Sequence, residues 1–152
     1  ISGTFGLILL VIFWIFFRES LVFLDNLQSF IFIPILFVLG FTISQTLKII
    51  VGMTAFWLTD FRGLQQIIEI MILVFGGYVM PIHLLPRTIE IISYFTPLPY
   101  IIYFPILAFQ GKLLGSEILK TACIQILWLF LLLVLYKYMF YKGIKKFTGV
   151  GQ

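Results

Sequence analysis

Cysteine, histidine and charge are all scarce in this chain, and each shortage excludes a class of site. Of 152 residues, one is cysteine, one is histidine and only 11% are charged. A single thiol excludes an internal disulfide and a thiolate metal cluster, so we expect Cys123, inside an apolar run, to be a small packing residue. His83 has no second histidine at metal-ligand spacing, and we expect a structural or interfacial role for it. We therefore predict no metal and no cofactor in this chain.

Catalytic and nucleotide-binding motifs are also missing. The chain has no phosphate-binding loop of the form GxxxxGKS or GxxxxGKT, and no Ser/His/Asp or Cys/His set is visible. We do not expect an enzyme, and if ATP drives its work, that ATP binds to a partner. No basic patch with interleaved base-stacking aromatics is visible, which argues against a nucleic-acid partner.

Apolar residues, by contrast, make up 62% of the chain, whereas about half is usual in soluble proteins. This excess predicts an all-α, polytopic membrane protein embedded in lipid. We expect a single transmembrane domain over residues 1–152, forming the C-terminal part of a longer protein because the chain begins at Ile1 within an apolar run. Four spanning helices are predicted, at about 1–17, 29–57, 63–80 and 117–141.

Between the last two predicted spans lie two apolar runs, Thr88–Phe95 and Tyr100–Phe109, that are too short to cross a membrane. A crossing needs roughly 20 apolar residues, and prolines between the runs prevent one continuous helix. We predict a short re-entrant or interfacial helical hairpin over about 86–110 on the outer side, which requires protein or water to cover its backbone. Its marker residues are Pro81, Pro86, Arg87, Glu90, Pro97, Pro99 and Pro105.

The first short run carries one polar face. Arg87 and Glu90 are three residues apart, and Tyr94 follows one turn later, while isoleucines fill the other positions. We expect this face to meet the outer water rather than a ligand.

Lysines are concentrated at the C-terminal end and set the expected orientation. The cluster comprises Lys137, Lys142, Lys145 and Lys146, with no acidic residue among them. Because positive charge favours the cytoplasmic side, we expect a cytoplasmic C-terminus. We also expect a multi-pass protein of the plasma (cell) membrane, of bacterial origin. Ser116 is expected to cap the last helix and Gly143 to stop it.

Glu69 is the most informative polar residue within a predicted span, with Gln65 one turn before it on the same face. A carboxylate in a membrane helix is costly and normally faces the bundle interior or a wet cavity. Two interpretations stay open. Either the pair lines a substrate path, or Glu69 is structural, near the headgroups, and paired with Lys48 or with a neighbouring helix.

Several short motifs follow one another in order through the second part of the chain. They are Gly52-Met-Thr-Ala-Phe-Trp57, Gly63-Leu64, Gly76 with Met80-Pro81 and Leu85-Pro86, Thr96-Pro97-Leu98-Pro99-Tyr100, Tyr103-Phe104-Pro105 with Gly111, and Tyr141-Lys-Gly143-Ile-Lys-Lys-Phe147 with Gly149-Val-Gly151. This ordered set resembles the C-terminal part of an ABC-2-type transporter permease, the membrane subunit of an ATP-binding-cassette exporter. The resemblance covers roughly residues 40–152.

The resemblance implies six membrane helices in a full subunit and an outer re-entrant element before the last one. It also implies a homo- or heterodimer of permease subunits docked on a cytoplasmic ATPase that binds the ATP, and efflux as the direction of transport. The usual ATPase-docking coupling helix precedes the third spanning helix of such proteins and is not in this chain. An alternative of another class stays open: a non-transporting membrane scaffold or accessory subunit. The polar residues are too few to indicate a cargo.

Overall fold

The computed structural model describes residues 27–57, 62–113 and 115–148, and all regular structure in these ranges is helical. The first predicted span, 1–17, lies outside the described residues. The elements in chain order are α2 (Leu27–Met53), η3 (Thr54–Phe56), α3 (Arg62–Phe75), η4 (Ile82–Leu84), α4 (Arg87–Tyr94), α5 (Tyr103–Phe109) and α6 (Gly115–Thr148). The prediction of an all-α protein is thus confirmed for the described part of the chain.

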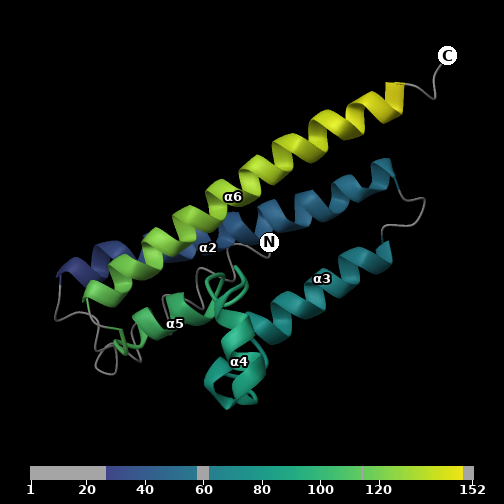
Figure 1. Ribbon diagram of the computed structural model, residues 1–152. Helices are drawn as coiled ribbons and strands as arrows, with labels where there is room; N and C mark the ends of the chain where they lie inside the picture. Colours follow the sequence, from purple (N-terminus) through teal and green to yellow (C-terminus); the bar gives the residue numbers. More distant parts are fainter. Residues whose placement is uncertain (1–26, 58–61, 114, 149–152) are drawn as a thin grey trace, which may run out of the picture.

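The two long helices, α2 and α6, run side by side in the same direction and form the main axis of the fold (Figure 1). Their first turns meet in one buried cluster that contains Ile33 and Ile118. Further along, Ile43 and Leu132 belong to a second cluster, and Phe56 lies against Gly143 near the other end. Two helices that run parallel require the chain between them to return to its starting side.

Both long helices are long and apolar enough to cross a membrane, over Phe32–Phe56 and Gly115–Lys145. They overlap the predicted spans 29–57 and 117–141. Pro34 lies inside α2, past its first turn, so its missing amide removes one backbone hydrogen bond of the helix. These are the two membrane-length helices among the described residues.

The helix predicted over 63–80 is shorter in the structure, because α3 ends at Phe75. At 14 residues it is about 21 Å long, less than the ~30 Å hydrocarbon layer. Gly77 takes a left-handed φ of +80°, and the amide of Tyr78 donates to the carbonyl of Leu73, which closes the helix end. The chain therefore turns at Gly77, well before Pro81.

The last helix is longer than the predicted 117–141. Helix α6 begins at Gly115, so Ser116 is inside the helix rather than its cap, and it continues through Gly143 to Thr148. A Cβ on Gly143 would lie within 3 Å of the Phe56 ring. Gly143 is thus a packing residue that lets η3 approach α6, and not a helix stop.

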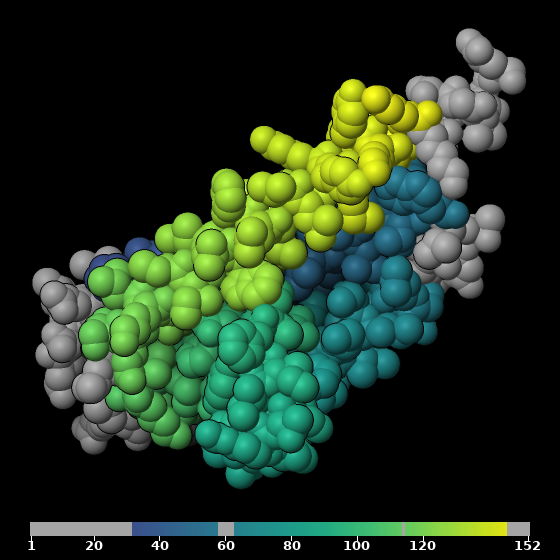
Figure 2. All heavy atoms as spheres, in the orientation of Figure 1, coloured from purple at the N-terminus to yellow at the C-terminus, as the bar shows by residue number. Residues whose placement is uncertain are grey.

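The predicted hairpin is present as two short helices, α4 and α5, joined by a turn over residues 95–102. Pro86 is the N-cap residue of α4, and Pro105 lies in the first turn of α5. Amides in a first turn have no intrahelical acceptor, so a proline there removes no helix hydrogen bond. Pro97 and Pro99 lie in the turn, as expected from the sequence. Figure 2 shows α4 and its neighbours as a bulge on one side of an elongated molecule, beside α3 and α6.

The hairpin is inserted against the long helices rather than lying apart from them. Leu98 and Ile101 of the turn share a buried cluster with Ile43 and Leu132. Ala108 of α5 joins the cluster at the first turns of α2 and α6. The turn therefore lies beside the middle of α2, and α5 leads from there toward the start of α6.

Candidate functional site

Gln125 of α6 joins the hairpin turn to both long helices. Its side chain is wholly buried, and its Nε2 donates to the carbonyl oxygens of Leu36 (3.0 Å) and Tyr100 (2.7 Å). A turn carbonyl inserted among apolar helices needs such a donor, since an unpaired buried carbonyl is costly. The Oε1 of Gln125 is itself buried and has no hydrogen-bond partner among the described residues.

Gly40 of α2 lets the turn approach closely. A Cβ at this position would lie 2.3 Å from the carbonyl oxygen of Ile101 and 3.1 Å from that of Tyr100. Any side chain here would displace the turn from α2. Gly40 and Gln125 thus hold the same two-residue segment from opposite helices, and we call this contact the turn clamp.

A chain of polar groups covers the other end of the hairpin. Arg87 forms an ion pair with Glu90 (3.3 Å), and the Tyr94 hydroxyl donates to Glu90 (3.2 Å). Tyr94 is hydrogen-bonded to Tyr103, whose hydroxyl lies 3.2 Å from Nδ1 of His83. The predicted shared polar face of Arg87, Glu90 and Tyr94 is confirmed, and the chain ties η4, α4 and α5 together.

Burial raises the pKa of Tyr94 to about 12, with the nearby Tyr103 and the Glu90 carboxylate adding to the effect. Burial also raises the pKa values of Tyr100 and Tyr103. The protonated hydroxyls of Tyr94 and Tyr100 donate hydrogen bonds, to the Glu90 carboxylate and to the Tyr94 carbonyl oxygen. Stacking of Tyr100 on Phe104, with ring centroids 4.7 Å apart, fixes the orientation of Tyr100.

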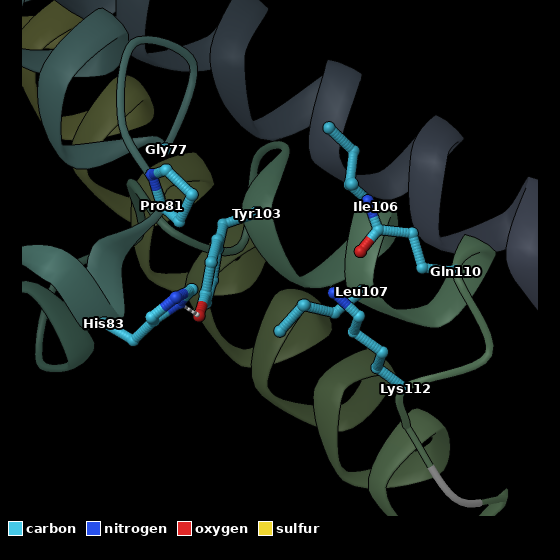
Figure 3. Close-up of a pocket in the computed structure, with 8 residues that line it drawn as sticks. All are labelled: Gly77, Pro81, His83, Tyr103, Ile106, Leu107, Gln110 and Lys112. Carbon is cyan, nitrogen blue, oxygen red and sulfur yellow. Dashed lines mark hydrogen bonds between the residues drawn. The ribbon is translucent and has the colours of Figure 1, made fainter.

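A small cavity of about 150 Å³ lies beside this polar chain. Figure 3 shows His83 and Tyr103 facing each other on one side of it, with Gln110 and Lys112 on the opposite side. Gly77, Pro81, Ile106 and Leu107 complete its lining.

A larger cavity, of about 400 Å³, lies between α2, the end of α3 and the hairpin turn. Its lining combines an apolar wall with one cation and several hydrogen-bonding side chains, namely Phe37, Phe41, Ser44, Gln45, Lys48, Ile72, Tyr78, Ile101 and Ile102. Lys48 is half-buried there. We call this space the Lys48 cavity.

Gln65 and Glu69 lie on α3 as predicted, where the Gln65 amide donates to Glu69 Oε1 at 3.5 Å. Glu69 is exposed and borders an open hollow of about 290 Å³ with Gln66, Ile70 and Leu73. Within the described ranges, Glu69 forms no ion pair with Lys48. The structure does not bring Glu69 to the turn clamp or the Lys48 cavity.

The predicted lysine cluster lies on the last turns of α6. Lys142 contacts the Tyr138 hydroxyl and lies over its ring, and Lys145 lies 4.2 Å from the centre of the Tyr141 ring. Tyrosines are enriched where a helix leaves a membrane, and lysines are enriched on the cytoplasmic side. Cys123, also on α6, is exposed and unbonded, so the expectation of a packing role is wrong for the contacts within the described residues.

Comparison with known sequences decides the family. Residues 2–151 match the sequence family described as ABC-2 family transporter protein. The chain belongs to the ABC-2 family. This confirms the resemblance seen in the motifs between residues 40 and 152 and extends it to the N-terminal part. No curated protein and no solved structure matches the chain significantly.

Membership of the ABC-2 family, together with the apolar helices, makes this a membrane protein of a transport family. The sequence alone does not predict the turn clamp. Its only signal is one amide, Gln125, within the apolar run of α6, and nothing in the run indicates the two carbonyls it contacts.

Proposed function

We propose that this chain is a membrane-spanning permease subunit of an ATP-binding-cassette exporter, forming the translocation path as a dimer and powered by a separate ATPase. The observation that carries the proposal is the match to the ABC-2 family over almost the whole chain. The chain has no phosphate-binding loop of its own, so ATP would bind to the partner.

The arrangement of the helices supports a specific membrane placement. Helices α2 and α6 run in the same direction, so the chain between them returns to the side where α2 begins. The lysine cluster at the end of α6 favours the cytoplasm for that end. The hairpin then enters from outside, reaches the middle of α2 at the turn clamp and returns, in the plasma membrane.

Transport would follow a shift between inward-open and outward-open dimers, driven by nucleotide binding to the ATPase. The turn clamp supports this mechanism because it joins α2, α6 and the hairpin into one packed unit. Helix α3 shares fewer buried side chains with the rest, and its exposed Gln66 and Glu69 face would line the path or meet the second subunit.

Affinity purification of the full-length protein from its own cells tests this proposal. We expect an ATPase with a phosphate-binding loop to co-purify in mild detergent, and the complex to hydrolyse ATP after reconstitution into vesicles. An unrelated membrane protein with the same tag is the control. If no such ATPase is enriched over the control, the chain acts as a scaffold or accessory subunit and the exporter proposal is wrong.

A further inference from the structure

The Lys48 cavity has the size and composition of a small-molecule site. Its volume of about 400 Å³ lies within the usual range for ligand pockets, and its lining is mostly apolar with a few polar groups. The backbone around it is well defined by packing, because Ile72 and Ile101, which line it, are both buried in the main core cluster. The cavity is therefore part of the folded bundle rather than a gap between loosely associated elements.

Lys48 is the unusual residue in this lining. It lies in the inner half of the membrane-length segment Phe32–Phe56 and is half-buried. Lys48 forms no ion pair within the described residues, and the salt bridge found there joins Arg87 to Glu90. Intramembrane cations normally face a cavity and are paired with an opposite charge. The cavity thus offers a cation that has room for an anion beside it.

The side chains of α2 change character along the cavity. Phe37, Phe41, Ser44 and Lys48 recur every three to four residues and so form one stripe along the helix, over about 16 Å. The Cα–Cβ bond of a helical residue is tilted toward the helix N-terminus, so the Lys48 side chain leaves the helix on the Ser44 side. The stripe is apolar at its outer end and cationic at its inner end.

We propose that the Lys48 cavity binds an amphiphile with an anionic headgroup, a phosphate, sulfate or carboxylate on an alkyl chain. The headgroup pairs with Lys48 and is hydrogen-bonded by Ser44, Gln45 or Tyr78, and the alkyl chain lies along Phe37 and Phe41. A resident membrane lipid and a transported cargo share this chemistry. Binding does not depend on the proposed function, whereas a cargo role rests on it.

The test uses the full-length protein in a neutral detergent, with dodecyl phosphate as the probe and dodecyltrimethylammonium as the matched cation. Native mass spectrometry measures binding. We expect dodecyl phosphate to bind more tightly than the cation, and Lys48→Gln to weaken it by about tenfold, the scale of one charge-assisted contact. Lys48→Arg should keep most of the affinity.

Lys120→Gln is the control, because it removes the same charge from an exposed position on α6 outside the cavity. Ser44→Phe is a second, independent variant that fills the cavity and keeps the charge, and it should also weaken binding. Unfolding midpoints show that each variant is folded. If Lys48→Gln and Ser44→Phe bind dodecyl phosphate as well as the wild type does, or lose no more affinity than Lys120→Gln, the proposal is overturned.

The source of the ligand is then separated from the existence of the site. If dodecyl phosphate stimulates ATP hydrolysis by the co-purified complex, and Lys48→Gln abolishes that stimulation, the ligand is cargo. If binding depends on Lys48 without stimulation, and anionic lipid co-purifies with the wild type but not with Lys48→Gln, the ligand is a resident lipid. Absence of any ATPase would contradict the proposed function while leaving the binding result intact.

Discussion

Gln125 shows how one side chain makes a buried turn acceptable inside an apolar bundle. Its Nε2 donates to two carbonyl oxygens that come from different parts of the chain, Leu36 and Tyr100. Without these donors the turn carbonyl would be buried among apolar side chains with one partner fewer. The amide therefore acts on the position of the hairpin as well as on stability.

We predict that Gln125→Leu, which keeps the size but removes both donors, lowers the free energy of unfolding by about 1–2 kcal/mol. Thermal unfolding in detergent measures this. Gln66→Leu is the matched control, because Gln66 is exposed on α3 and should tolerate the change. An equal effect of the two substitutions would show that the clamp contributes nothing specific.

Tyr94 gives a second prediction at this scale, through pH. Its pKa is about 12 in the folded protein and about 10 in an unfolded chain, so the folded state binds more protons between these values. Stability from this group is fully present below pH 10 and is lost as the pH rises toward 12.

Absorbance of phenolate at 295 nm checks the shift. The titration curve of the wild type minus that of Tyr94→Phe should contain one step near pH 12, because burial and the Glu90 carboxylate both disfavour the ionised phenol. A difference step near pH 10 would mean that Tyr94 is solvated and that the polar chain of the hairpin does not form as described.

At the scale of elements, the approach of the hairpin to α2 depends on one glycine. Gly40 faces the carbonyl of Ile101, whereas a Cβ added at Gly52, about three turns further along the same helix, would meet no described neighbour within 4 Å. The two glycines therefore offer a matched pair within one helix.

We expect Gly40→Ala to destabilise the protein by about 1–3 kcal/mol, because the added methyl meets backbone that must shift. Gly52→Ala should be neutral or stabilising by about 0.5–1 kcal/mol, since alanine is the better helix former. Unfolding midpoints of the two variants decide the matter, and a loss of stability in Gly52→Ala equal to that in Gly40→Ala would refute the close approach.

The elements differ in how far the sequence predicts them. The sequence predicts the long apolar helices and the proline-divided hairpin. The length of an apolar run and the prolines that interrupt a helix can both be read within one segment. The predicted end of α3, at residue 80, is wrong although Gly76 and Gly77 are visible, because glycines permit a left-handed turn without requiring one. The sequence predicts a helix stop at Gly143. It does not predict the packing role of Gly143, because Phe56, the residue that it contacts, is far away in the sequence.

The candidate site is harder to predict than the fold for the same reason. The polar face of Arg87, Glu90 and Tyr94 is local to one helix, and the sequence predicts it. The turn clamp and the Lys48 cavity join residues from α2, the hairpin and either α6 or the end of α3. Tertiary contacts of this kind leave no periodic signal in the sequence.

At the scale of the whole molecule, large apolar side chains are exposed along both long helices, among them Phe41 on α2 and Phe130 on α6. A soluble protein would cover such surfaces, whereas lipid or a second subunit covers them in a membrane. Together with membership of the ABC-2 family, this exposure supports the proposed placement of the chain as part of a larger membrane assembly.

The central claim is that the hairpin enters from outside without crossing, so that the end of α6 is cytoplasmic. Single cysteines at Arg87, whose side chain is 81% exposed at the start of α4, and at Thr148 test it in a Cys123→Ser background. A membrane-impermeant maleimide should label the Arg87→Cys protein in intact cells, and the Thr148→Cys protein only after permeabilisation. Labelling of Thr148→Cys in intact cells, or of Arg87→Cys only after permeabilisation, would contradict the account.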